Sequence, residues 1–258
     1  MQNAIATLEQ LENVPSRKEG ISEEQEEQLR MFGCELIQSA GILLKLPQVA
    51  MGTAQVLFQR FYYMASLKQF GILEIAMGAV FLAAKVEESF TRLSYVVTVF
   101  DHLQRRTRNE PMYPPLDQFS QRAYELKNMI VASEMQILKH LGFHVHVQLP
   151  YGVLINYLRI LGQEENQAVA SRAWNYLNDG LRTKVYATYD PPVIACAAIW
   201  MACCEKEIKL PDGWWLLFDT AYDDLTNAAK LIRRVYYAKL DRQHLPLYAH
   251  EMDKWLAK

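Results

Sequence analysis

Ten consecutive residues between Glu74 and Lys85 are apolar or glycine, and this run constrains the fold more than any other part of the sequence. The stretch from Ile72 to Ser89 is predicted to be a helix with no polar face in its middle, which is typical of a helix buried among other helices. A helix that crosses a membrane needs about 20 apolar residues, so this one is expected in a protein core. Its charged end predicts that it emerges at a surface. Small residues allow neighbours to approach it closely: Ala76, Ala79, Ala83 and Ala84.

Apolar residues at helical spacing, separated by prolines and glycines, predict eight more helices. In the first half of the chain they are expected at 22–46, 48–64, 91–108 and 118–141. In the second half they are expected at 150–161, 165–183, 191–207 and 222–240. Residues 1–22 are polar and are expected to form a tail with one helical turn. Three prolines predict a loop at 109–117, and a short extended piece is expected at 143–147.

An internal repeat relates the two halves of the chain. AMGAVFLAAKVEE at 76–88 aligns without a gap on ACAAIWMACCEKE at 195–207, which lies 119 residues later. At the same offset, residues 52–61 fall on residues 171–180. This similarity favours two all-helical domains of about 110 residues, each built around a central helix of small residues. Chance similarity between apolar helices is the alternative.

The composition argues against several classes of protein. A formal net charge of -2 and a pI near 6.3 give no overall attraction to nucleic acid or to an anionic membrane, so strong binding to either is not expected. The N-terminal residues lack the charged and apolar regions of a signal peptide, so an intracellular protein is expected. The cysteines lie in apolar helical patterns and form no C-x-x-C pair, which predicts buried, reduced thiols and no zinc site. They are Cys34, Cys196, Cys203 and Cys204.

A tandem repeat of helical domains whose Ala-rich third helix ends in Lys-x-Glu-Glu resembles the cyclin box fold. LAAKVEE at 82–88 is similar to the family's L-A-x-K-x-E-E signature, and EMQILKHLGFHV at 134–145 is similar to its fifth-helix pattern. The likeness is closer still to the cyclin L subfamily, through residues 33–63, 138–147 and 173–186. The resemblance implies an all-α fold of two tandem five-helix cyclin-box domains with flanking segments. The expected divisions are an N-terminal segment at 1–23, boxes at 24–147 and 148–240, and a C-terminal extension at 241–258.

The resemblance also implies a function. The chain is expected to be a noncatalytic, activating subunit of a cyclin-dependent kinase of the PITSLRE subgroup, as a heterodimer. It is expected to act in RNA polymerase II transcription and pre-mRNA splicing in the nucleus, with splicing factors as possible further partners and with no cofactor, metal or membrane. By position, Lys85 and Glu134 match the charged pair that grips the kinase. The matching contact positions around this pair are Leu82, Val86, Glu87, Glu88, Leu138, Phe143 and Val145.

Simpler interpretations of these charged residues exist. Lys85 could instead pair with Glu88, three residues along the same helix, for a few tenths of a kcal/mol. Arg105, Arg106 and Arg108 form the one local basic cluster, which is either a solvated helix end or a contact for an acidic or phosphorylated partner or RNA. The histidines at 140, 144 and 146 lack the spacing of metal ligands.

Other functions fit the same helical repeat. A scaffold of the transcription factor IIB type shares tandem cyclin-like folds, but it calls for a basic DNA-facing surface and a Cys-rich zinc ribbon. A scaffold like the retinoblastoma pocket would bind short peptides without a kinase partner. No nucleophile, base or cofactor constellation indicates an enzyme. Cell-cycle cyclins dock substrates through an M-R-A-I-L motif, whereas this chain reads RMFGCELIQSAGILL at 30–44, so docking of that kind is not expected.

Overall fold

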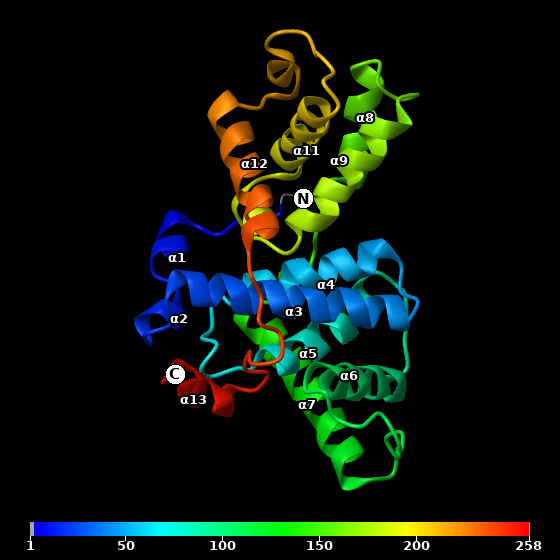
Figure 1. Ribbon diagram of the computed structural model, residues 1–258, viewed down its shortest axis with the longest axis vertical. Coiled ribbons are helices and arrows are strands. Elements are labelled where there is room, and N and C mark those ends of the chain that lie inside the picture. Colours follow the sequence, from blue (N-terminus) through cyan, green and yellow to red (C-terminus); the bar gives the residue numbers. More distant parts are fainter. Residues whose placement is uncertain (1–2, 258) are drawn as a thin grey trace. The chain divides into compact units, whose positions relative to one another are not determined.

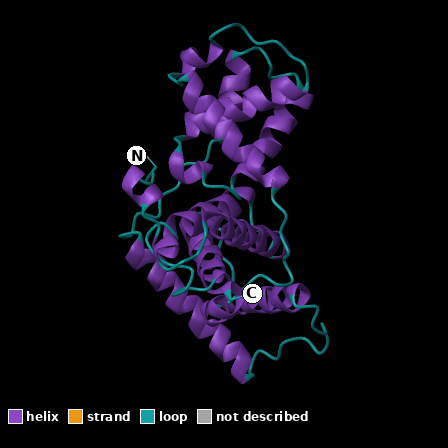
Figure 2. Ribbon diagram, turned by 60° about the vertical axis from the view of Figure 1, so that its left-hand side comes forward, coloured by secondary structure: helices purple, strands orange, loops and turns teal. Residues whose placement is uncertain are grey.

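The computed structural model describes residues 3–257, and over that range it contains helices and no strand (Figure 2). The chain divides into two compact units. The first unit consists of residues 6–147 together with the C-terminal segment from residue 239, and the second unit consists of residues 148–238 together with the described N-terminal residues up to 5.

The helices of each unit follow the predicted order. In the first unit they are α1 (Leu8–Glu12), α2 (Pro15–Lys18), α3 (Glu23–Leu43), α4 (Gln48–Phe61), α5 (Ile72–Val86), α6 (Leu93–Thr107) and α7 (Gln121–His140), followed from the C-terminal segment by η2 (Ala249–Glu251) and α13 (Met252–Leu256). In the second unit they are α8 (Tyr151–Ile160), α9 (Gln167–Gly180), α10 (Val185–Thr188), α11 (Pro191–Glu205), η1 (Trp214–Phe218) and α12 (Tyr222–Tyr237). The nine helices expected from the sequence are therefore confirmed, with ends that differ by a few residues.

Helix α5 is the centre of the first unit and packs against α3, α4, α6 and α7 (Figure 1). Its four alanines are all buried. Gly78 faces α7 so closely that a Cβ atom there would lie 2.7 Å from Ser133 Cβ and 2.9 Å from the Glu134 nitrogen. Real side chains do not tolerate contacts this short, so the crossing of α5 and α7 depends on glycine.

Helix α11 has the same position in the second unit, where it packs against α8, α9, α10, α12 and η1. Helices α5 and α11 are the two segments that the internal repeat aligns. The flanking repeat segments correspond to α4 and α9, each of which packs on the central helix of its own unit. The repeat is therefore a repeat of packing as well as of sequence.

Three of the four cysteines are buried, and the fourth is not. Burial raises the pKa of the Cys196 and Cys203 thiols to about 11, so both remain protonated at neutral pH. Cys34 is also buried, but Cys204 is exposed, so the expectation that all four are buried is wrong. Adjacent residues of a helix point about 100° apart, and at the last turn of α11 this rotation takes Cys204 off the buried face.

Residues 6–21 form two short helices and pack on the first unit, so the expectation of a polar tail is wrong. Val14 and Ile21 are buried, and together they supply the apolar contact that a tail would lack. Ser16 is also buried, and its hydroxyl accepts a hydrogen bond of 3.0 Å from the Leu67 backbone nitrogen. The bond to Leu67 attaches the segment to the loop between α4 and α5.

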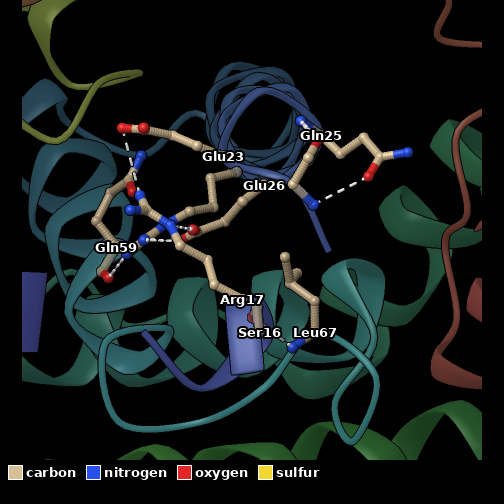
Figure 3. Close-up of polar contacts among 9 residues, drawn as sticks. Ser16, Arg17, Glu23, Gln25, Glu26, Gln59 and Leu67 are labelled. Carbon is tan, nitrogen blue, oxygen red and sulfur yellow. Dashed lines mark hydrogen bonds and ion pairs between the residues drawn. The ribbon is translucent and has the colours of Figure 1, made fainter. Parts of the chain in front are cut away.

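A buried polar network holds α2, α3 and α4 together (Figure 3). The Glu26 carboxylate is 1% exposed and lies 2.8 Å from Arg17 Nε and 2.5 Å from Arg30 Nη1. Arg30 also donates through Nε to the Gln59 side chain at 2.9 Å, and through Nη2 to the Gln59 carbonyl. A charged group in a core is tolerated when its partners are all present, and this carboxylate has two guanidinium partners.

The C-terminal segment from residue 239 returns to the first unit. Arg242 forms two hydrogen bonds with the Glu35 carboxylate on α3, at 2.7 and 3.0 Å. The Leu247 carbonyl accepts a 3.0 Å bond from the Leu73 nitrogen at the start of α5. The segment buries Leu245, Leu247 and Met252. The extension expected at 241–258 is thus, over its described residues, a packed part of the first unit.

Replacing Glu26 with Gln keeps the side-chain volume but removes the charge between the two arginines. Because Arg30 is then buried without a counter-charge, we expect the free energy of unfolding to fall by about 3 kcal/mol. Urea denaturation followed by circular dichroism measures this change. Glu24→Gln, at an exposed position of the same helix, should change it by less than about 0.5 kcal/mol, and equal losses in the two variants would contradict a structural role for the network.

Candidate functional site

Lys85 and Glu134 form an ion pair at the surface of the first unit. Lys85 Nζ lies 2.7 Å from Glu134 Oε1 and 2.8 Å from Oε2, so one ammonium group contacts both carboxylate oxygens. The Lys85 side chain is 43% exposed and that of Glu134 is 14% exposed. Lys85 therefore pairs with α7 rather than with Glu88, whose backbone takes a φ of +52° just beyond the end of α5.

The pair is held in place by packing on both helices. The close crossing at Gly78 places the backbone of residues 133 and 134 against α5. On the other side, the Lys85 ammonium lies 4.1 Å from the centre of the Phe81 ring, close enough for a cation–π interaction. Because Lys85 is confined by Phe81 and Glu134, its charged group has a fixed position before any partner binds.

Apolar side chains surround the ion pair on α7. Val131 is 52% exposed and Met135 is 58% exposed, and with Leu138 they follow the spacing of one helical face around Glu134. Val131 and Met135 were not among the residues predicted from the sequence. Their spacing is nevertheless visible there, because Met135 follows Val131 by four residues and Leu138 follows Met135 by three. The exposed Phe143 and Phe90 follow the ends of α7 and α5. We use the name α5–α7 face for the ion pair together with five apolar residues: Lys85, Glu134, Phe90, Val131, Met135, Leu138 and Phe143.

The remaining residues predicted to contact the kinase differ in their burial and in the direction of their side chains. Leu82 is buried, while Val86 and Leu138 are half-buried at the edge of the α5–α7 face. Glu87 accepts a 2.7 Å hydrogen bond from the Thr53 hydroxyl, so its carboxylate is directed toward α4. Val145 is half-buried beyond the end of α7. The structure thus brings Lys85 and Glu134 together and directs Glu87 inward.

The three arginines at the end of α6 have different surroundings. Arg105 pairs with the buried Asp101 at 2.8 Å, and Arg108 pairs with Glu251 of the C-terminal segment at 2.6 Å. Arg106 is exposed and borders a cavity of about 370 Å³ next to Arg242. The charges of Arg105 and Arg108 therefore stabilise the fold, and Arg106 is the member of the cluster most accessible to an acidic or phosphorylated partner.

The histidines near the end of α7 are not arranged as ligands. His140 Nδ1 lies 2.8 Å from the Gln136 carbonyl, and its ring packs against Phe61 with the centroids 5.1 Å apart. His144 and His146 are exposed. Within residues 3–257, no three His, Cys, Asp or Glu side chains gather in a way that could hold a metal ion. Over the same range, no helix combines the length and the apolar character that crossing a membrane requires.

Comparison with protein families matches residues 3–146 to the model of the cyclin N-terminal domain. Human cyclin-L2 is 41% identical to this chain over 249 residues, which are 95% of this chain and 47% of cyclin-L2. Human cyclin-L1 is 41% identical over 255 residues, which are 98% of this chain and 48% of cyclin-L1. The chain therefore spans about half the length of the curated relatives it matches.

Solved structures show the same fold at low sequence identity. A chain of the yeast RNA polymerase II CTD kinase CTDK-1 complex superposes with a TM-score of 0.73 at 18% identity, covering 98% of this chain and 83% of that one. A chain of the CAK complex of Chaetomium thermophilum bound to ATP-gamma-S gives a TM-score of 0.60 at 18% identity, covering 91% of this chain and 68% of that one. The likeness extends over both units.

A side chain at Gly78 should disturb the α5–α7 face from within. Gly78→Ala places a Cβ atom against Ser133 and pushes α7 away from α5, so we expect the free energy of unfolding to fall by about 1 to 3 kcal/mol. Gly152→Ala in α8 is the matched control, because no atom lies within 4 Å of its added Cβ and alanine favours a helix. Thermal denaturation measures both; a Gly78→Ala variant as stable as Gly152→Ala would contradict the close crossing.

Proposed function

The chain belongs to the cyclin family, and from this premise we propose that it is the noncatalytic, activating subunit of a cyclin-dependent kinase. The match to the cyclin N-terminal domain and the likeness to solved structures over nearly the whole chain support the tandem cyclin boxes expected from the sequence. We further propose that the kinase is of the PITSLRE subgroup and that the pair acts in RNA polymerase II transcription and pre-mRNA splicing in the nucleus. The 41% identity to cyclin-L1 and cyclin-L2 supports this subgroup.

The observation that carries the proposal is the ion pair of Lys85 and Glu134 within exposed apolar side chains. A surface ion pair of this kind contributes about 0.2 to 1 kcal/mol to folding, so folding alone gives little reason for it. Its apolar neighbours Val131 and Met135 are each more than half exposed, although burying such side chains against a partner lowers the free energy. Exposed apolar residues around a fixed charge are the composition of a protein interface.

The pair can bind a partner while it remains intact. An ammonium group has three N–H donors, and Lys85 directs its charge to two oxygens of a single carboxylate, which leaves donor capacity for a carbonyl of the partner. The Glu134 carboxylate has lone pairs left to accept from a backbone N–H of the partner. Such charge-assisted hydrogen bonds fix the orientation of a bound chain, while Leu138, Met135 and Phe143 supply its apolar contact.

Activation requires no chemistry from this chain. A protein kinase is active only when a lysine of its third strand pairs with a glutamate of its C helix. A protein that packs on the C helix fixes its position and therefore completes the kinase site. In the proposed complex the α5–α7 face packs on that helix.

Lys85→Glu and Glu134→Lys should each leave the chain folded but weaken the kinase complex by about 2 kcal/mol or more, which is roughly thirtyfold in Kd, because a like or unpaired charge becomes buried in the interface. The double variant Lys85→Glu and Glu134→Lys restores the ion pair with reversed polarity, and it should remain weak because the partner's donors and acceptors are unchanged. The measurements are the Kd for a PITSLRE-type kinase domain and phosphorylation of a Ser-Pro peptide from the RNA polymerase II tail.

Arg242→Glu is the matched control, since Arg242 also forms a two-bond ion pair in the first unit with similar exposure. It should leave the Kd unchanged if it stays folded by circular dichroism. Full affinity of the Lys85→Glu and Glu134→Lys variants would contradict the assigned face. Binding of another transcriptional kinase in place of the PITSLRE type would contradict the subgroup alone, and binding of no kinase would favour a scaffold.

A further inference from the structure

The second unit exposes two adjacent leucines on a short, well-anchored helix. Leu216 is 67% exposed and Leu217 is 69% exposed, both in η1. The ends of η1 are fixed, because Trp214 and Phe218 are buried and the Phe218 ring stacks on Tyr157 with the centroids 3.7 Å apart. The exposed leucines are therefore presented by a rigid element of the fold.

Aromatic rings continue this apolar surface. Trp215 is half-buried and packs against Tyr222, the first residue of α12, with the ring centroids 5.1 Å apart. Tyr222 is 50% exposed. We call Trp215, Leu216, Leu217 and Tyr222 the η1 patch. It offers both aliphatic and aromatic surface to a partner.

Exposed carboxylates flank the η1 patch in the sequence. Residues 207–229 contain five acidic side chains and one basic side chain, that of Lys209. The four carboxylates nearest the patch in sequence belong to Asp212, Asp219, Asp223 and Asp224, and all four side chains are exposed. Among residues 3–257, no cationic side chain lies within 4.0 Å of any of these carboxylates. In their first-turn position, Asp223 and Asp224 also favour the N-terminus of α12, but Asp212 and Asp219 lie outside any helix.

The internal repeat shows how unusual this region is within the chain. In the first unit the central helix α5 is followed by α6, which has fifteen residues and buries Val96, Phe100 and Leu103. In the second unit the central helix α11 is followed by η1, which has five residues. The second unit therefore has a short element with two uncovered leucines where the first has an amphipathic helix with its apolar face buried.

We propose that the η1 patch binds a basic segment of another protein in which large apolar side chains alternate with arginines. The apolar side chains of the segment would cover Leu216 and Leu217, because a contiguous patch of exposed apolar side chains is typical of a protein interaction site. The guanidinium groups would pair with the surrounding aspartates and stack on the Tyr222 ring. Charge complementarity identifies this partner, and the inference does not rest on the kinase role of the first unit.

Charge also argues against the other occupants of such a patch. In a two-fold contact with a second copy of the chain, the same four aspartates would face one another, and like charges across an interface are unfavourable. Nucleic acid and anionic membranes carry negative charge themselves, so the aspartates repel both. A positively charged protein segment is the partner that meets both the apolar and the acidic parts of the surface.

The test measures fluorescence anisotropy of labelled probe peptides with the full chain. The first peptide is LRRLLRRLLRRL, the Arg probe. The Lys probe and the Glu probe replace every Arg with Lys or Glu, and the Ala probe replaces every Leu with Ala. We expect the Arg probe to bind saturably and more tightly than the Lys probe, and the Glu and Ala probes to bind at least about tenfold more weakly. Added salt should weaken binding of the Arg probe.

Two double variants separate the parts of the site. Leu216→Ser with Leu217→Ser removes the apolar contact, and Asp212→Asn with Asp219→Asn removes charge without touching α12; asparagine tolerates the positive φ of Asp219. Each double variant should bind the Arg probe about tenfold more weakly than the unchanged chain does. The control for the leucine variant is Ile160→Ser, and the control for the aspartate variant is the double change Glu164→Gln with Glu165→Gln. These positions are exposed in the same unit, and changing them should leave binding of the Arg probe unchanged. Equal affinity of the leucine variant, equal binding of the Glu probe, or no saturable binding of the Arg probe would overturn the proposal.

Discussion

The close contact between α5 and α7 is the constraint on which the rest of the first unit depends. Gly78 has no Cβ, and only for that reason can the α7 backbone at Ser133 and Glu134 approach α5 at that point. The same approach brings Glu134 within 2.8 Å of Lys85, the second-last residue of α5. A packing requirement in the core thus determines the geometry of a charged pair at the surface.

The first unit is closed by segments from both ends of the chain. The N-terminal helices attach through Val14, Ser16 and the Glu26 network, and the C-terminal segment attaches through Leu247 and the Arg242–Glu35 pair. Both segments reach the region around the start of α5. The conformation of the central helix is therefore supported by residues that are more than 200 positions apart in sequence.

The two units use their central helices for different surfaces. In the first unit the end of α5 carries the ion pair and the apolar side chains of the α5–α7 face. In the second unit the region after α11 carries the η1 patch and its unpaired aspartates. The two proposed surfaces therefore differ in chemistry: the first combines an ion pair with apolar side chains, and the second combines apolar side chains with uncompensated carboxylates.

Much of the fold could be predicted because the local spacing of apolar residues, prolines and glycines indicates where helices begin and end. The ten-residue apolar run, the prolines and the glycines determined nine helices, and the aligned segments 76–88 and 195–207 determined that the two central helices are equivalent. The cyclin resemblance rested on the motifs at 82–88 and 134–145, and the family comparison confirms it. Lys85 and Glu134 were identified as a pair by that resemblance and not by any spacing between them.

Tertiary structure decided what covers each helix face. Lys85 lies three residues from Glu88 but pairs with Glu134, 49 residues away, because helix crossing determines which charges meet. Residues 1–22 were predicted to be a polar tail, yet the buried Val14 anchors the described part of this segment to the first unit. Cys204 looked buried and is exposed. Helical periodicity specifies which face of a segment is apolar, whereas only the packed chain specifies which distant residues cover that face and which side chains remain uncovered.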